Sequence, residues 1–168
     1  MAATSTLPAT GNNEVLNATP GANGVAVFDV TAAQLAAIPS YQINLNGATS
    51  VIFNVSGSSL NWNANYESSD AADTKIIWNF YQATSLTFNT LIGGTVLAPD
   101  AAVTNNNQID GTLVANSWTG QGELHEYGFT GTLPTSTTTV AVPEPAALVL
   151  LIGGLLVVWR MRAHKSRS

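Results

Sequence analysis

Asp110, Glu123 and His125 are the residues whose types and spacing could support catalysis or metal binding. His125 is the single histidine ahead of Pro143, so a Ser-His-Asp triad in that part of the chain would depend on it. If residues 122–127 (GELHEY) form a strand, Glu123 and His125 point to one face, and Asp110 could approach from the preceding strand. A metal or acid/base site is one interpretation. Hydrogen bonds that close the end of a domain are the other, and we favour it.

The rest of the sequence lacks the motifs of familiar catalytic chemistry. It contains no Gly-x-Ser-x-Gly elbow, no histidine pair with metal-ligand spacing and no phosphate-binding loop. No Asp-rich loop offers the converging oxygens that calcium needs. The absence of cysteine excludes thiolate catalysis and cysteine metal sites. We therefore expect a protein that is not an enzyme and that uses no metal or cofactor.

Threonine and aromatic side chains are the candidates for a ligand face. Thr95 and Thr112 share a register in a repeat described below, so one flat face could carry a small threonine ladder that binds ice or polysaccharide. Plain β-propensity also explains these threonines. Trp62 and Tyr66 lie in a polar segment, residues 56–73, that we expect to be an exposed excursion. Their rings could stack on sugars.

Composition favours β-structure with many turns. Thr, Asn and Gly are abundant and apolar residues recur regularly between them, while 9% of residues are charged, which argues against intrinsic disorder. Residues 1–24 show little sign of regular structure. Thr31 suits the N-cap of a short helix that Pro39 would stop. The strands expected around this helix are Val25–Val30, Gln42–Leu45 and Val51–Val55.

A 17-residue repeat organises the second half of the domain. The segment GTVLA at 94–98 recurs as GTLVA at 111–115. Further matches at this offset are Leu86 with Val103, Thr87 with Thr104, Asn89 with Asn106 and Ile92 with Ile109. VIFNV at 51–55 and IIWNF at 76–80 share a pattern at a spacing of 25, as if one turn had gained a loop. Short strands at near-constant spacing predict an all-β fold, a right-handed parallel β-solenoid over residues 25–131, rather than a sandwich joined by hairpins.

Charge divides the chain into two parts. Ahead of Pro143, nine acidic residues and the single base Lys75 give a net charge of −8, whereas Glu144 and four later basic residues give +3. A domain with one lysine has no basic patch, so we expect no nucleic-acid binding. Residues 132–141, rich in Thr and Ser, join the two parts and are expected to form an extended polar stalk.

The second part contains a short apolar run. Ala146–Trp159 holds no charged residue, and as a helix its fourteen residues would be about 21 Å long, against about 30 Å of hydrocarbon in a bilayer. Trp159 stands where an interfacial aromatic belongs, and Arg160 and Arg162 can extend to the lipid headgroups. We expect a transmembrane helix of marginal length at 146–159, with the basic end in the cytoplasm and the domain outside.

The order of parts at the C-terminus resembles a known sorting signal. Val142, Pro143, Glu144 and Pro145 are followed by the apolar run and by the basic tail at 160–168, as in the PEP-CTERM signal of bacteria. The resemblance implies an exosortase as partner, a membrane enzyme that processes the chain near the Pro-Glu-Pro triplet. Such tails are also catalogued as an "ice-binding protein C-terminal" region, a label that gives this chain no ice activity. The helix would then be a temporary anchor, with release to the extracellular matrix after processing.

The domain resembles a second family. The segments that carry the likeness are IWNF at 77–80, ATSL at 83–86, GTVLAP at 94–99, DGTLVA at 110–115 and GELH at 122–125. Together they resemble the choice-of-anchor A domain, an exported, adhesin-like bacterial domain, over roughly residues 25–131. That family usually opens with further strands bearing a Gly-Gly-Asn segment, behind a signal peptide. Residues 1–23 show neither feature. We expect either a truncated or misassigned start or a chain that is not exported through its N-terminus.

Three functional hypotheses follow. The first is a non-enzymatic, exported, adhesin-like protein of the cell envelope, sorted through its Pro-Glu-Pro signal. The second is an ice- or carbohydrate-binding module with an exopolysaccharide or another surface as ligand. The third is a tail-anchored protein whose domain stays in the cytosol.

Overall fold

Strands dominate the part of the chain that the computed structural model describes, residues 1–9, 11–67 and 70–134. The strands are β1 (Glu14–Asn17), β2 (Val25–Thr31), β3 (Ser40–Asn44), β4 (Ser50–Ser56), β5 (Ser59–Trp62), β6 (Asn65–Tyr66), β7 (Ile76–Asn79), β8 (Ser85–Phe88), β9 (Ile92–Gly93), β10 (Thr95–Asn105), β11 (Ile109–Asp110), β12 (Leu113–Gly120) and β13 (Leu124–His125). The helices are α1 (Ala32–Ala36) and α2 (Asp70–Asp73). All pairings among these strands are parallel. The prediction of a mostly β fold with parallel strands is confirmed.

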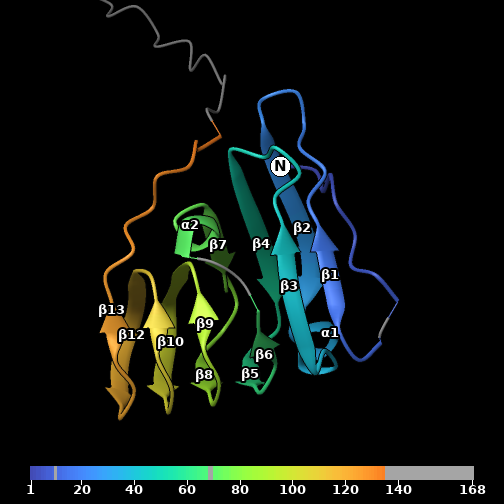
Figure 1. Cartoon of the computed structure of the whole chain (residues 1–168). Helices are drawn as coiled ribbons and strands as arrows, with labels where there is room; N and C mark the ends of the chain where they lie inside the picture. The colour runs from blue at the N-terminus through green and yellow to red at the C-terminus, as the bar shows by residue number, and fades with distance from the viewer. Residues whose placement is uncertain (10, 68–69, 135–168) are drawn as a thin grey trace, which may run out of the picture. The chain divides into compact units, whose positions relative to one another are not determined.

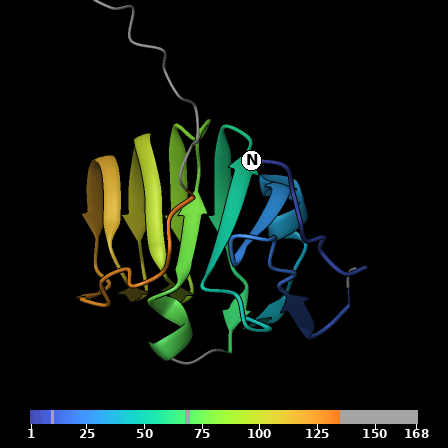
Figure 2. The ribbon, with the colours of Figure 1, turned by 90° about the horizontal axis from the view of Figure 1, so that it is seen from above.

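The strands of Met1–Pro134 form a curled, half-barrel sheet (Figure 1). Its main part has the order β2-β4-β7-β10-β8-β5, and β12 pairs with β10. Two smaller sheets have the orders β1-β3-β6 and β13-β11-β9. Figure 2 shows the strands side by side, with the blue N-terminal strands at one end and the orange C-terminal strands at the other. Strands that are spatial neighbours are thus equivalent segments from successive parts of the chain.

The spacing of the sequence repeat is also the register of strand pairing. The 17-residue offset pairs Val96 with Leu113 and Ala98 with Ala115 in β10 and β12. The same offset pairs Ile92 with Ile109, Leu86 with Val103 and Thr87 with Thr104. The 25-residue spacing pairs Val51 with Ile76. The repeat therefore reflects strand pairing, because equivalent residues of neighbouring parallel strands lie opposite each other.

A column of aromatic rings fills the interior behind β2, β4 and β7. Phe28 stacks on Phe53 with centroids 4.6 Å apart, and Phe53 stacks on Trp78 at 4.1 Å. All three side chains are buried. The Trp78 Nε1–H donates to the Gly93 carbonyl oxygen at 2.8 Å, so the indole carries no unsatisfied donor into the core. This column holds the three strands in one register, since stacking works only between equivalent positions.

The predicted short helix is present as α1. Thr31 is its N-cap: the Thr31 Oγ1 accepts from the Gln34 backbone N–H at 3.1 Å, and the Gln34 Oε1 accepts from the Thr31 N–H at 2.8 Å. This reciprocal pair is a capping box. Leu35 is buried and the helix ends before Pro39, which removes a backbone donor.

Residues 56–67 and 70–73 are part of the fold, so the prediction of an exposed excursion over 56–73 is wrong. They contain β5, β6 and α2. Trp62 is 2% exposed and meets Tyr41 and Trp78 edge-on, with centroids 5.4 and 5.2 Å away. β5 alternates exposed and buried residues, which is the period of a half-buried strand. Its polar residues are the outward-facing half of this alternation.

The N-terminal segment also differs from expectation, because β1 lies within residues 1–24 and pairs with β3. A further parallel bridge joins Ser5 to Phe28 in β2. Within the described ranges, no helix is long and apolar enough to cross a membrane. The predicted transmembrane helix at 146–159 and the motif at 142–145 lie outside those ranges, as does most of the predicted stalk.

Candidate functional site

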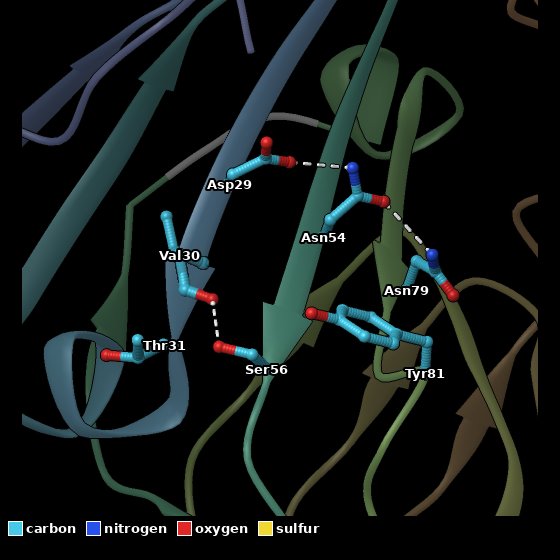
Figure 3. A pocket seen from close by; sticks show the side chains of 7 residues that line it. All are labelled: Asp29, Val30, Thr31, Asn54, Ser56, Asn79 and Tyr81. Atoms are coloured by element: carbon cyan, nitrogen blue, oxygen red, sulfur yellow. Dashed lines mark hydrogen bonds between the residues drawn. The ribbon is translucent and has the colours of Figure 1, made fainter. Parts of the chain in front are cut away.

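A row of polar side chains crosses the outer surface of β2, β4 and β7. The strand register places Asp29 opposite Asn54 and Asn54 opposite Asn79. Their chain neighbours Phe28 and Phe53 point inward, so the polar residues point outward because side chains alternate along a strand. Figure 3 shows the three side chains in line across the strands. We call this row the amide ladder.

Hydrogen bonds join the rungs of the amide ladder in one direction. Asn54 Nδ2 donates to Asp29 Oδ1 at 2.8 Å, and Asn79 Nδ2 donates to Asn54 Oδ1 at 3.0 Å. An ionised carboxylate can only accept, so Asp29 requires Asn54 to present its NH₂ group. Asn54 then presents its oxygen to Asn79. The carboxylate at one end therefore sets the orientation of both amides and holds the row in place.

The amide ladder lines a polar groove with a volume of about 460 Å³. The lining residues are Asp29, Val30, Thr31, Asn54, Ser56, Asn79 and Tyr81. Two hydroxyls of the lining are already engaged: Ser56 Oγ donates to the Val30 carbonyl at 3.3 Å, and Thr31 Oγ1 belongs to the capping box of α1. The groove therefore offers its amides, its carboxylate and the ring of Tyr81 to a ligand.

Tyr81 provides the aromatic surface of the groove. It follows β7 by two residues and its side chain is 50% exposed, although most aromatic rings of the described chain are in the core. Figure 3 shows its ring beside Asn79, with the hydroxyl directed toward β4. An exposed ring next to fixed amides is a combination typical of sites that bind partly polar, partly apolar ligands.

An apolar hollow of about 330 Å³ lies on the other side of the amide ladder. Its lining includes Asn54 and Asn79 together with apolar residues: Met1, Val27, Ile52, Ile77, Leu97, Leu133 and Pro134. Ser50 Oγ donates to the Thr132 carbonyl at 2.6 Å, which ties the segment that carries Leu133 to β4. The two hollows thus share the side chains of Asn54 and Asn79, and the carboxylate of Asp29 lies in the polar groove.

The threonine face expected from the repeat is not formed. Thr112 is exposed, but Thr95 is 7% exposed and its Oγ1 is buried without a hydrogen-bond partner. The two residues do share a register, because the next pair along the strands is Val96 with Leu113. A flat ladder of accessible hydroxyls needs both, so the prediction of Thr95 as a ligand contact is wrong.

The aromatic candidates also lie elsewhere than expected. Trp62 is part of the core, so its ring cannot meet a ligand. Tyr66 is half-buried, stacks obliquely on Tyr41 at 4.9 Å and donates its hydroxyl proton to Asp73. These two residues support the interior, and Tyr81 is the exposed aromatic beside a groove.

His125 does meet Asp110 and Glu123, as the strand argument predicts. The His125 Nδ1 lies 2.8 Å from Asp110 Oδ1, and Nε2 lies 2.9 Å from Glu123 Oε2. The hydrogen bond to Glu123, followed by the contact with Asp110, raises the pKa of His125 above its ordinary value. Two carboxylates, one at each ring nitrogen, favour the imidazolium form.

The same residues pair the last strands. The Ile109 N–H donates to the Glu123 carbonyl at 3.0 Å, and the Gly111 N–H donates to the His125 carbonyl at 2.9 Å. Among the described residues, no group of three or more acidic, histidine or cysteine side chains has the geometry of a metal site. The contacts of this cluster are those of a clasp at the end of the sheet.

Sequence reasoning missed the amide ladder, although a signal for it was present. The spacing of 25 that relates Asn54 to Asn79 also relates Asp29 to Asn54, within the segments VFDV, IFNV and IWNF. The 25-residue comparison made above covers the second and third segments. Extending the 25-residue comparison one step toward the N-terminus would have aligned all three rungs.

Comparison with known proteins gives one family. The model of a family described as "Putative Ice-binding-like adhesive domain" matches residues 1–126, which include the amide ladder, Tyr81 and the His125 clasp. This match does not support either of the two family resemblances described above. No curated protein and no solved structure gives a significant match.

Proposed function

Because the chain belongs to the family of ice-binding-like adhesive domains, we propose that it is a non-enzymatic, adhesin-like surface protein whose polar groove makes the adhesive contact. The observation that carries the proposal is the amide ladder. Asp29, Asn54 and Asn79 form an outward row whose orientations are fixed by their own hydrogen bonds. A row fixed in advance loses little conformational freedom on binding, which favours adhesion to an extended surface.

Retention of the full chain on bacterial cell surfaces tests this function. The chain, purified in mild detergent and labelled with a fluorophore, should remain on washed cells, and an excess of unlabelled chain should displace it. An unrelated protein of similar size and negative charge is the control. Retention equal to that of the control would contradict an adhesive role.

The strand order supports the finer proposal that the half-barrel is a β-solenoid, and we expect it to be right-handed because connections between parallel strands almost always are. The first half of β10 pairs with β7 and its second half with β8, while the following β11 pairs with β9. One segment of the chain therefore stacks on three consecutive earlier strands in the same order, as in a coil placed on its neighbour. An experimental structure with antiparallel hairpins between these strands would refute the solenoid.

The C-terminal residues support a proposal about delivery. The Pro-Glu-Pro triplet, the apolar run at 146–159 and the basic tail would hold the chain in the membrane with the domain outside until an exosortase processes it. Protease added to intact cells should then digest the domain. A protected domain would favour the alternative, a tail-anchored protein that faces the cytosol.

Ice binding is the second candidate, and the family description is what favours it. The burial of Thr95 removes one half of the threonine pair on which the sequence argument relied. Thermal hysteresis measured on the full chain decides this candidate. A freezing-point depression that exceeds the melting-point depression would establish ice binding, and equal values would reject it.

A further inference from the structure

We propose that the groove formed by the amide ladder and Tyr81 binds a neutral polysaccharide, with the sugar chain running across the strands and one sugar ring stacked on Tyr81. This inference rests on the proposed adhesive function and names the class of ligand that the groove takes.

The dimensions of the groove suit a short stretch of a polymer. Neighbouring strands lie about 4.8 Å apart, so the rungs on β2, β4 and β7 span about 10 Å. This is the length of a short oligosaccharide in an extended conformation. The groove volume of about 460 Å³ is in the range of small-ligand sites. The hollow is open to solvent rather than enclosed, so a polymer longer than the row of rungs can lie across it.

The free polar atoms of the ladder match the chemistry of hydroxyl groups. Asp29 keeps Oδ2 as an acceptor, Asn54 keeps its second N–H as a donor, and Asn79 keeps both a second N–H and Oδ1. A sugar hydroxyl donates one hydrogen bond and accepts others. A line of alternating donors and acceptors can therefore pair with successive hydroxyls of one chain, while an apolar ligand would leave these groups unpaired.

Tyr81 supplies an aromatic surface on which one face of a sugar ring can stack. One face of a pyranose ring consists largely of C–H groups, which pack well against an aromatic ring. The half-exposed Tyr81 ring lies next to the fixed amide of Asn79 (Figure 3). Stacking and hydrogen bonding can thus act on the same sugar unit.

Charge restricts the class of polysaccharide. The Asp29 carboxylate lies in the groove. The part of the chain ahead of Pro143 has nine acidic residues and one base, a net charge of −8. Among the described residues, those that line the groove include no basic side chain to pair with a uronate or sulfate group. An anionic polymer would meet repulsion both in the groove and around it, so the ligand is a neutral polymer.

Affinity electrophoresis of the full chain tests the inference, with neutral laminarin, dextran and hydroxyethylcellulose as probes and alginate as the anionic comparison. We expect at least one neutral polymer to retard the chain and alginate to leave its mobility unchanged. The inference is wrong if no neutral polymer retards the chain, or if alginate retards it more strongly than the neutral polymers do.

Substitutions in the groove test whether the polysaccharide binds there. Tyr81→Ala and Asn79→Ala should each weaken affinity about tenfold, whereas Tyr81→Phe, which keeps the ring, should lose less. A second ladder gives a matched control: Asn89 Nδ2 donates to Asn63 Oδ1 at 2.9 Å, and Asn106 Nδ2 donates to Asn89 Oδ1 at 2.8 Å. Asn89→Ala breaks an equivalent ladder away from the groove and should leave affinity unchanged.

The readouts separate this inference from the adhesive function. A chain that adheres to cells but binds polysaccharide equally well with and without Tyr81 would refute the groove as the polysaccharide site and leave the adhesive function standing. A chain that does not adhere to cells refutes the adhesive function, whatever the electrophoresis shows. Equal losses in Asn79→Ala and Asn89→Ala would also refute the groove, because the effect would then be one of folding. The thermal unfolding midpoint of each variant checks this point.

Discussion

The indole of Trp78 stacks on the ring of Phe53 with centroids 4.1 Å apart and an interplanar angle of 15°. Trp78 also joins the core column to strand β9, through the 2.8 Å hydrogen bond from its Nε1–H to the Gly93 carbonyl. The column lies directly behind the amide ladder, one residue along each strand. The rigidity of the groove therefore depends on the packing of the ring column.

Trp78→Ala should strongly destabilise the domain. Removing a fully buried indole costs about 3–5 kcal/mol, since the transfer energy is lost and a cavity remains. Urea unfolding followed by circular dichroism measures this loss. Tyr81→Ala, at a 50% exposed ring, is the control and should change stability by less than about 1 kcal/mol.

A milder variant keeps this prediction testable if Trp78→Ala does not fold. Trp78→Phe retains a stacked ring but leaves the Gly93 carbonyl without its donor, at a cost of about 1–3 kcal/mol. If Trp78→Phe were as stable as the wild type, the hydrogen bond to Gly93 would have no structural importance.

Gly111→Ala should also destabilise the chain. A Cβ at this position would overlap the backbone carbonyl oxygen of Gly94, the residue 17 positions earlier in the repeat. Backbone cannot move aside as a flexible side chain can, so we expect a loss of about 2–3 kcal/mol in the free energy of unfolding. Gly128→Ala, where an added Cβ meets nothing within 4 Å, is the matched control. Equal stability of the two variants would contradict the close approach of these strands.

The ion pairs of the His125 clasp should stabilise the end of the sheet more at a pH below the pKa of His125 than above it. The pKa of His125 is raised in the folded chain, chiefly by Glu123 and then by Asp110. A raised pKa contributes stability that is fully present below the unfolded pKa, about 6.5, and is lost as pH rises through the higher folded pKa. The Gly111 amide, which donates to the His125 carbonyl, should therefore be better protected from hydrogen exchange, after correction for the intrinsic rate, below this range than above it.

Glu123→Gln is the control for the clasp. It keeps the shape of the side chain but removes its charge, so the NMR titration midpoint of His125 should fall toward the ordinary value. An unchanged midpoint in this variant would show that Glu123 does not set the pKa of His125.

Replacement of Pro143, Glu144 and Pro145 by alanine should leave the unprocessed chain in the membrane of a host that carries an exosortase. Immunoblots of membrane and culture-medium fractions measure this outcome. Alanine at Thr137, Thr138 and Thr139, upstream of the motif, is the control and should not affect release. Unchanged maturation of the Pro-Glu-Pro variant would refute the sorting proposal.

Repeat spacings in the sequence predict several of the residue pairs across the sheet. The 17-residue match of Ile92 with Ile109 and the 25-residue match of Val51 with Ile76 became strand registers, because parallel strands place equivalent residues opposite each other. The N-cap at Thr31 could also be predicted from the sequence, since a capping box depends on residues within one turn. The meeting of His125 with Glu123 also followed from local alternation.

Which side chains are exposed to solvent depends on packing between distant parts of the chain. Trp62 sits in a polar stretch but is buried by Tyr41 and Trp78, which come from other strands. Thr95 matches Thr112 in sequence, yet one is buried and the other exposed. Burial depends on what packs against a residue from distant parts of the chain, and no local pattern records it. For the same reason the sequence contains only the 25-residue spacing of the amide ladder. That its rungs and Tyr81 line one groove follows from the tertiary structure.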